Sequence, residues 1–450
     1  MSKYIVIIVI VIGSILRIIL SLSTPPNNSY DDHLAPIAKY INNNSRPMPQ
    51  ECWQCYQPPL YYFVASKVFI TSYLVFDNYY LSWKFVQFIN VLLSIINLVI
   101  ISLLLRQIYF KNELSIAVLI SFLSFYPRDI YASVMITNDY LLVVLTSLSV
   151  LLFINFVKNE SKINYLLLCF CVFCCSISKQ HGLILIVLNL FIIFKSIYLK
   201  YKFSNFRYFY SVITIICCLS DEIWKFLNTG ILLVSNQNFF NYTINQLPGD
   251  FNDISFTSFY FMELLHNPFL STTTLHSFWT EIFARSWFDY EWRFLSPKIL
   301  SIQYLSISLY LVGLLVLITV IIGVIKYRSK LYKLNINYFC LVFICLCFFA
   351  VPVLQTYRFP YFSSMKSQFF LPAISIICLG LYYLYIQLNI KSIYMFIMIS
   401  LFLFIGVFHV MFIVFHMNFS LDNLNAPLWQ FPFINSYSVS TTFPINKMIF

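Results

Sequence analysis

The residue types best suited to chemistry stand at the start of a polar segment that follows an apolar N-terminal run. Asp31, Asp32 and His33 put two adjacent carboxylates beside an imidazole. Such a group can act as a general base, or it can hold a divalent cation through oxygen and nitrogen ligands. The simpler alternative is a solvated loop in which an aspartate caps a helix over residues 34–41. The local sequence leaves both interpretations open.

A second group of charges lies farther along the chain. Arg128 precedes Asp129, and Asn138-Asp139 stand directly before an apolar run that begins at Tyr140. Asp139 could simply cap the helix that starts there and meet the positive end of its dipole. Two acids and an arginine in a short segment at membrane depth are also functional candidates, because ionisable groups are costly there.

Three cationic side chains complete the candidate set. Lys179 stands with Gln180 and His181 in a turn between two apolar runs, and Arg358 and Lys366 flank the start of another. Positive charge and N–H donors suit a lipid phosphate. Each of the three could instead be an interfacial anchor whose charge reaches into the headgroup region.

The elements that must position these residues are membrane helices. Of the 450 residues, 60% are hydrophobic and only 10% are charged, whereas a soluble protein carries about 25% charged residues. Apolar stretches of about 20 residues, the length needed to cross a hydrocarbon core, recur along the chain. The net charge of +11 is spread in short clusters between these stretches, which indicates membrane topology rather than nucleic-acid binding.

We therefore predict an all-α polytopic membrane protein with about eleven spanning helices. The expected spans are Tyr4–Leu22, Phe85–Leu105, Leu114–Tyr126, Tyr140–Val157, Ile163–Ser178, Gly182–Leu199, Tyr208–Ser220, Ile302–Ile325, Ile336–Leu354, Phe369–Leu388 and Ser392–Phe415. The first is expected to be a retained helix, because no small-residue cleavage site follows it.

Pro58–Phe76 is apolar enough to span but is interrupted by Lys67. If it does not span, the basic clusters of the later loops share one face with Lys3, as the positive-inside rule requires. We therefore expect this segment to lie along the membrane interface as a juxtamembrane helix, with the N-terminus cytoplasmic.

This topology divides the chain into four parts. They are an N-terminal membrane module over 1–220 that contains the first external loop (23–84), a large external loop over 221–301, C-terminal helices over 302–416 and an external tail over 417–450. Shorter external loops are expected over 127–139 and 355–368. Loops longer than about 12–15 residues usually carry function, so the working site is expected outside.

Cysteine usage adds one open question. Ten of the twelve cysteines lie in apolar runs, where a free thiol behaves as a small hydrophobe. Cys52 and Cys55 lie in the first external loop. A C-x2-C pair can be a redox site, half of a zinc site or a local disulfide. Since no second pair lies nearby, a disulfide or two bystander thiols are favoured over zinc.

Four short motifs make the sequence resemble the GT-C superfamily of polyprenyl-phosphate-sugar-dependent glycosyltransferases, and within it the family 39-like enzymes. Asp31-Asp32 is similar to that family's Asp-Glu motif after the first helix. Gln57–Tyr62, which reads Gln-Pro-Pro-Leu-Tyr-Tyr, resembles His/Lys-Pro-Pro-Leu-Tyr-Tyr and is the most specific piece. Asn138-Asp139 resembles a second family acid, and Lys366–Ala373 a Lys/Arg-Tyr-Leu-Leu-Pro-Ala stretch. The chain looks most like protein O-mannosyltransferases and bacterial lipid A aminoarabinose transferases.

The resemblance implies roles for these residues. Asp31, with Asp32 beside it, is the implied catalytic base, and Asp139 would orient the acceptor or, together with Asp31, hold a divalent metal. No other cofactor is implied. The implied substrate-binding residues are His33, Gln57, Tyr61, Arg128, Lys179, Arg358 and Lys366, of which Lys179, Arg358 and Lys366 are candidates for the donor phosphate. A lysine precedes the Pro-Pro pair in the aminoarabinose branch, and Gln57 in its place argues against a phosphate role there.

The implied reaction is inverting transfer of a sugar from a polyprenyl phosphate to a glycan, lipid or protein acceptor outside the cytoplasm. Membrane lipids are the other expected partners, and nucleic acid is not one. We expect the bacterial inner membrane, with the endoplasmic reticulum as the alternative. Three rival functions stay open: a transporter or lipid flippase, an inactive family member, and a glycan polymerase or ligase. Transporters place ionisable groups at mid-membrane, and Arg17 is the clearest such group here.

Overall fold

The computed structural model describes residues 2–26, 32–108, 113–198, 205–240, 249–269, 277–288, 300–331, 336–361, 365–388 and 392–420, and the regular structure of these residues is helical. The predicted all-α polytopic architecture is confirmed. Asp31 and the tail over 421–450 lie outside the described residues.

Six helices are long and apolar enough to cross a membrane. They are α1 (Ser2–Ser23), α4 (Tyr79–Ile108), α7 (Asp139–Asn159), α15 (Leu300–Leu331), α16 (Ile336–Arg358) and α18 (Ser392–Ser420). A seventh span is possible if α5 (Glu113–Phe125) and α6 (Pro127–Ser133), which are bent by 56° at their junction, count as one. The chain is a multi-pass membrane protein.

The remaining expected spans coincide with shorter helices. These are α8 (Lys162–Ser178), the 3-10 helix η1 (Gln180–Leu185) continued by α9 (Ile186–Tyr198), α10 (Asn205–Cys218), and η4 (Ser367–Ala373) continued by α17 (Ile374–Leu388). Every expected span therefore has a helix, while the total of about eleven crossings stays a prediction.

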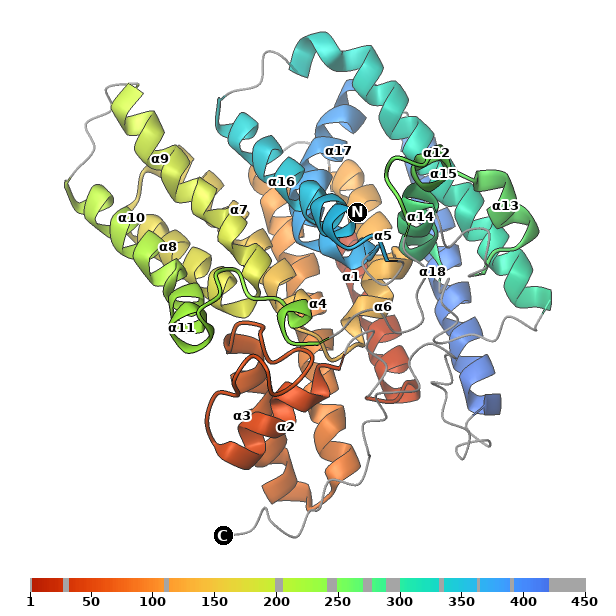
Figure 1. Cartoon of the computed structure of the whole chain (residues 1–450). Helices are drawn as coiled ribbons and strands as arrows, with labels where there is room; N and C mark the ends of the chain where they lie inside the picture. Colours follow the sequence, from red (N-terminus) through yellow and green to blue (C-terminus); the bar gives the residue numbers. More distant parts are fainter. Residues whose placement is uncertain are drawn as a thin grey trace.

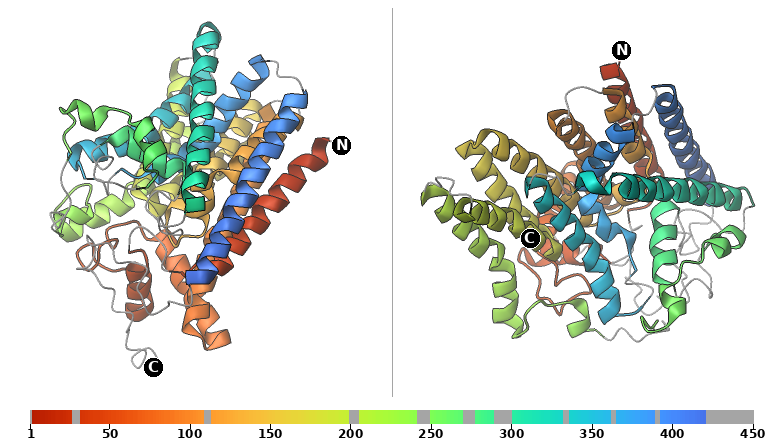
Figure 2. Two further views of the ribbon diagram at one scale, coloured as in Figure 1. Left: turned by 90° about the vertical axis from the view of Figure 1, so that its right-hand side faces the viewer. Right: turned by 90° about the horizontal axis from the view of Figure 1, so that it is seen from above.

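The helices form one bundle with an appended helical layer at one end. In Figure 1, α2 (Leu34–Asn43) and α3 (Leu60–Phe76) lie together below the bundle, and α3 packs against α4. Figure 2 shows α1 and α18 side by side on one flank, where the two helices are in contact. The juxtamembrane placement of α3 stays a prediction. The expected large external loop contains α11 (Ser220–Thr229), α12 (Ile254–Thr257), α13 (Phe261–His266) and α14 (Phe278–Trp287).

The break between α5 and α6 has an identifiable cause. Pro127 cannot continue the hydrogen-bond ladder of α5, but it suits the first turn of α6. The carbonyl groups at the end of α5 therefore need other donors. The buried guanidinium of Arg17, on α1, donates to the Ser124 carbonyl oxygen at 2.8 Å and to Asp129 Oδ2 at 2.6 Å. The Tyr140 hydroxyl donates to the other oxygen of Asp129.

Close packing of α1 on α5 makes this arrangement possible. A Cβ at Gly13 would lie 2.8 Å from the Cβ of Ser124, so only glycine lets the two backbones approach this far. The segment expected as a short external loop over 127–139 is thus mostly the buried helix α6, held in place by a charge from α1.

Candidate functional site

The centre of the candidate site is an ion pair at the head of α7. Lys179 Nζ donates to Asp139 Oδ1, and both side chains are buried, with exposed fractions of 5% and 3%. The ammonium compensates the charge of the buried carboxylate, which would otherwise be very costly. Asp139 Oδ2 is also buried and has no hydrogen-bond partner within the described part of the chain. One oxygen of this carboxylate is therefore held and the other can accept a bond from a ligand.

Two amides of α4 position the chain that leads into Asp139. Gln87 Nε2 donates to the Val134 carbonyl oxygen at 2.7 Å, and Asn90 Nδ2 donates to that of Thr137 at 3.0 Å. Both amide side chains are fully buried. The carbonyl groups between α6 and α7 lie outside regular helix, so these donors satisfy them and fix where α7 begins.

Asn138 links this segment to the Pro-Pro motif. Its Nδ2 donates to the Ser178 carbonyl oxygen at 3.0 Å and to Gln57 Oε1 at 3.4 Å. Tyr61, the second residue of α3, is buried and lies near Asn90 and Asp139. Two motifs that are about eighty residues apart in the sequence therefore meet at the head of α7.

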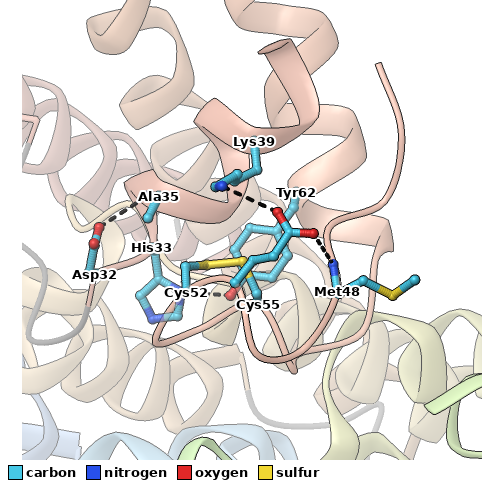
Figure 3. Close-up of a disulfide and its surroundings, with 9 residues drawn as sticks. Asp32, His33, Ala35, Lys39, Met48, Cys52, Cys55 and Tyr62 are labelled. Carbon is cyan, nitrogen blue, oxygen red and sulfur yellow. Dashed lines mark hydrogen bonds and ion pairs between the residues drawn. A yellow bond between two sulfur atoms is a disulfide. The ribbon is translucent and has the colours of Figure 1, made fainter. Parts of the chain in front are cut away.

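The first loop (23–84) adds one imidazole neighbour and a crosslink, and the turn after α8 adds a second imidazole. His33 Nδ1 lies 2.8 Å from the Tyr62 hydroxyl, and His33 and His181 both interact electrostatically with Asp139. Cys52 and Cys55 form a disulfide beside His33 (Figure 3). Of the alternatives left open by the sequence, the local disulfide is confirmed.

Asp32 and Glu51 have structural partners in the same loop, and Figure 3 labels Asp32 and the partners Ala35, Lys39 and Met48. Asp32 Oδ1 accepts the Ala35 backbone N–H at 3.0 Å, so the helix-cap interpretation holds for this oxygen. The backbone N–H of Met48, together with the ammonium of Lys39, lowers the pKa of the Glu51 carboxyl below its ordinary value. The role of Asp32 in chemistry stays a prediction, as does that of Asp31.

The Lys366–Ala373 motif forms η4, which packs against α7. Gln368 Oε1 accepts a hydrogen bond from Arg128 Nη2 at 2.5 Å, and both residues are buried. The ring of Phe369 lies 5.1 Å from Lys179 Nζ and edge-on to His181. Lys366 is buried at the start of η4.

Arg358 is the one predicted cation that the structure leaves outside this cluster. It is exposed at the end of α16, with its guanidinium 5.0 Å from the ring centroid of Phe359. Lys179, expected at a phosphate, contacts Asp139 here. The phosphate roles of both residues stay predictions.

The described residues of this site do not form a set of metal ligands. Within the described ranges, no group of three or more His, Cys, Asp or Glu side chains is arranged to hold one. Asp139 on its own does not supply the donor set, and the other predicted ligand, Asp31, lies outside those ranges.

Gln87 and Asn90 were not predicted as site residues. The available signal was two amides three residues apart, and thus on one face, in an otherwise apolar helix.

We expect Asn90→Leu to lower the apparent melting temperature by several degrees. The variant leaves the buried carbonyl of Thr137 without its donor, which costs about 1–3 kcal/mol of stability. Thermal unfolding in detergent measures the change. Asn97→Leu is the control, since Asn97 Oδ1 on the same helix has no hydrogen-bond partner in the described part. Equal losses in both variants would contradict the positioning role.

The chain resembles solved structures only in its backbone fold, and no protein family matches its sequence. No protein-family model and no curated protein matches the chain. Two structures of the Archaeoglobus fulgidus oligosaccharyltransferase, one complexed with zinc and sulfate and one tethered to an acceptor peptide, are similar at TM-scores of 0.40 and 0.44 and identities of 12% and 11%. They match 90% and 92% of this chain, which spans only 52% and 55% of theirs.

ArnT from Cupriavidus metallidurans bound to undecaprenyl phosphate has a TM-score of 0.36 and 13% identity, over 89% of this chain and 77% of its own.

Proposed function

We propose that this chain is an integral membrane glycosyltransferase that moves a sugar from a polyprenyl-phosphate donor to an acceptor hydroxyl on the extracytoplasmic face. The observation that carries the proposal is the buried Asp139–Lys179 pair, with one carboxylate oxygen unpartnered within the described residues. This pair lies where three of the four motifs meet. A buried carboxylate with a vacant acceptor oxygen suits a hydroxyl donor such as a sugar or an acceptor side chain.

The proposed step is a single displacement with inversion. The acceptor oxygen attacks the anomeric carbon, and the bond from that carbon to the phosphate oxygen breaks. The polyprenyl phosphate leaves with the electron pair, and the acceptor proton passes to Asp31 as general base. Asp139 would orient the hydroxyl through its second oxygen, while Lys179 holds the first.

Neutral and cationic groups around the pair suit the two substrates. Gln57 lies against Asn138 and is a neutral hydrogen-bonding group in this place. Arg128 and Lys366, which border η4, are the proposed contacts for the leaving phosphate, since charge-assisted bonds stabilise the negative charge that develops there. The polyprenyl chain would lie between apolar helices. A disulfide in the first loop supports an oxidising compartment on the site's side of the membrane, such as the outer face of a bacterial inner membrane.

The test is transfer of radiolabelled sugar from a mixed pool of polyprenyl-phosphate sugars by membranes that contain the wild type or Asp31→Asn. We expect transfer by the wild type and a loss of about 10²–10⁴-fold in the variant, the usual contribution of a general base. Asp77→Asn is the control, because Asp77 is exposed at the end of α3. Absence of wild-type transfer with every donor would overturn the proposal, and equal transfer by both proteins would remove Asp31 as base.

A transporter or lipid flippase is the alternative, and one observation favours it. The ion pair of Arg17 and Asp129 is buried among apolar helices, where ionisable groups often mark transport pathways. The guanidinium of Arg17 also donates to the carbonyl oxygens at the break after α5, which gives the pair a structural role as well. Flux of labelled lipid across vesicles that lack any sugar donor distinguishes this alternative.

A further inference from the structure

Helix α11 connects two parts of the site through a buried charge network. Arg46, in the first external loop, places Nη2 2.6 Å from Asp221 Oδ1 on α11. The same guanidinium lies 3.6 Å from the ring centroid of Trp224, also on α11. A planar guanidinium can make both contacts at once, whereas an ammonium cannot stack in this way.

The network continues from α11 to the turn that carries Lys179. Lys225, which is fully buried, lies 2.6 Å from Asp221 Oδ2 and 2.8 Å from Glu222 Oε1. Glu222 Oε1 also accepts a hydrogen bond from Gln180 Nε2 at 3.2 Å. Gln180 is the residue after Lys179. In Figure 1, α11 lies between the α8–α10 helices and the α2–α3 layer.

The charges of this network are balanced, because Arg46 and Lys225 face Asp221 and Glu222. A set with no net charge attracts neither an anionic nor a cationic ligand strongly. Asp221, Glu222 and Lys225 are buried and Arg46 is partly buried. The network therefore differs from ordinary surface ion pairs, which contribute little to stability. Loss of one member leaves another charge buried and unpaired, which is strongly destabilising. The network therefore resists separation of the segments that it joins.

We infer that α11 is a positioning element that holds the first external loop against the Lys179–His181 turn, with Arg46 and Asp221 as its positioning residues. The first loop carries His33, Gln57 and Asp31, and the turn carries the partner of Asp139. Docking of the loop by α11 would therefore set the positions of His33 and Gln57 relative to the carboxylate that orients the acceptor. The structural part of this inference stands alone, and only its kinetic part depends on the proposed function.

Hydrogen–deuterium exchange on the full-length protein in nanodiscs tests the structural part. We expect Arg46→Gln to speed amide exchange by about tenfold or more in three places, since a lost charged partner weakens all segments it holds together. These are the first loop, α11 and residues 180–185. The control is Lys39→Gln, because Lys39 pairs with Glu51 within the same loop at 3.2 Å and half-exposed. Unchanged exchange over 180–185 in both Arg46→Gln and Asp221→Asn would overturn the inference.

Kinetics test the positioning part. Arg46→Gln is expected to lower kcat about tenfold or more with little change in the KM of the donor, because misplacement of reacting groups slows the step. Arg46→Lys keeps the charge opposite Asp221 and should recover much of the loss, while Trp224→Leu should show a smaller loss of its own. A fall in kcat without any exchange change over 180–185 would contradict coupling through α11. If the wild type shows no transfer, the proposed function fails, and the exchange result still decides the structural part.

Discussion

Asp139→Asn is expected to lower sugar transfer by at least about 100-fold, the effect of misplacing a reacting group, and to lower stability as well, because Lys179 is left buried without its counter-charge. Asparagine keeps the shape of the side chain, but it replaces a charged acceptor with a neutral amide. The amide NH2 could then occupy the position of Oδ2, which has no partner among the described residues. A donor would replace an acceptor at that position. The acceptor hydroxyl would lose its orienting bond, and Lys179 would lose its counter-charge.

A paired variant separates a functional carboxylate from a purely structural ion pair. Lys179→Gln alone leaves a buried carboxylate unpaired and should lower both stability and transfer. In Asp139→Asn/Lys179→Gln the two neutral amides can bond to each other, so stability should recover. Transfer should not recover. Transfer assays and thermal unfolding of the four proteins measure this, and recovery of both properties in the double variant would show that the pair only supports the fold.

Arg17→Met is expected to destabilise the protein by about 3–5 kcal/mol, the cost of leaving a buried charge without its partner. The variant leaves Asp129 inside the bundle with the Tyr140 hydroxyl as its remaining side-chain donor among the described residues. It also removes donors to the carbonyls of Leu123 and Ser124 at the helix break. Adding Asp129→Asn should recover part of the lost stability, because it removes the unpaired carboxylate charge. Recovery should be incomplete, because the carbonyls at the helix break still lack the Arg17 donors.

The control for this prediction is Arg106→Gln. Arg106 pairs with Glu113 at 3.1 Å, and the two side chains have exposed fractions of 33% and 19%. Partly exposed pairs contribute about 0–1 kcal/mol. Unfolding midpoints in denaturant should thus change little for Arg106→Gln and greatly for Arg17→Met. Similarly small changes in the unfolding midpoints of both variants would contradict the prediction, because they would show that the Arg17–Asp129 pair contributes no more than a partly exposed pair.

The helices were largely predictable from the sequence, because apolar length alone determines which segments can cross a membrane. Each expected span coincides with a helix or with two consecutive helices. The helix α6 was not predicted, although Pro127 at its first position was a signal for it. A polar-looking segment between apolar runs was taken for a loop, while its burial depends on Arg17 from a helix far away in the sequence.

The site was predictable as a set of residues but not as a set of contacts. Asp139 and Lys179 were singled out separately, since each stands at the outer end of an expected span. Their pairing depends on how α7 packs against α8, which no local pattern encodes. The amides of Gln87 and Asn90 were missed for the same reason, because their partners are backbone carbonyls that belong to another segment.

The distance between Arg17 and Asp129 along the chain also has a consequence during synthesis. The two residues are 112 positions apart, so at 5–20 residues per second the arginine is synthesised roughly 6–22 s before the aspartate. In that interval the guanidinium must be tolerated at a cost of about 2.5–3.5 kcal/mol on insertion scales. The nascent first helix offsets this with the most apolar 18-residue window of the candidate spans, a mean hydropathy of 3.0. Less apolar substitutions near Arg17 are therefore expected to delay membrane integration before they affect the finished fold.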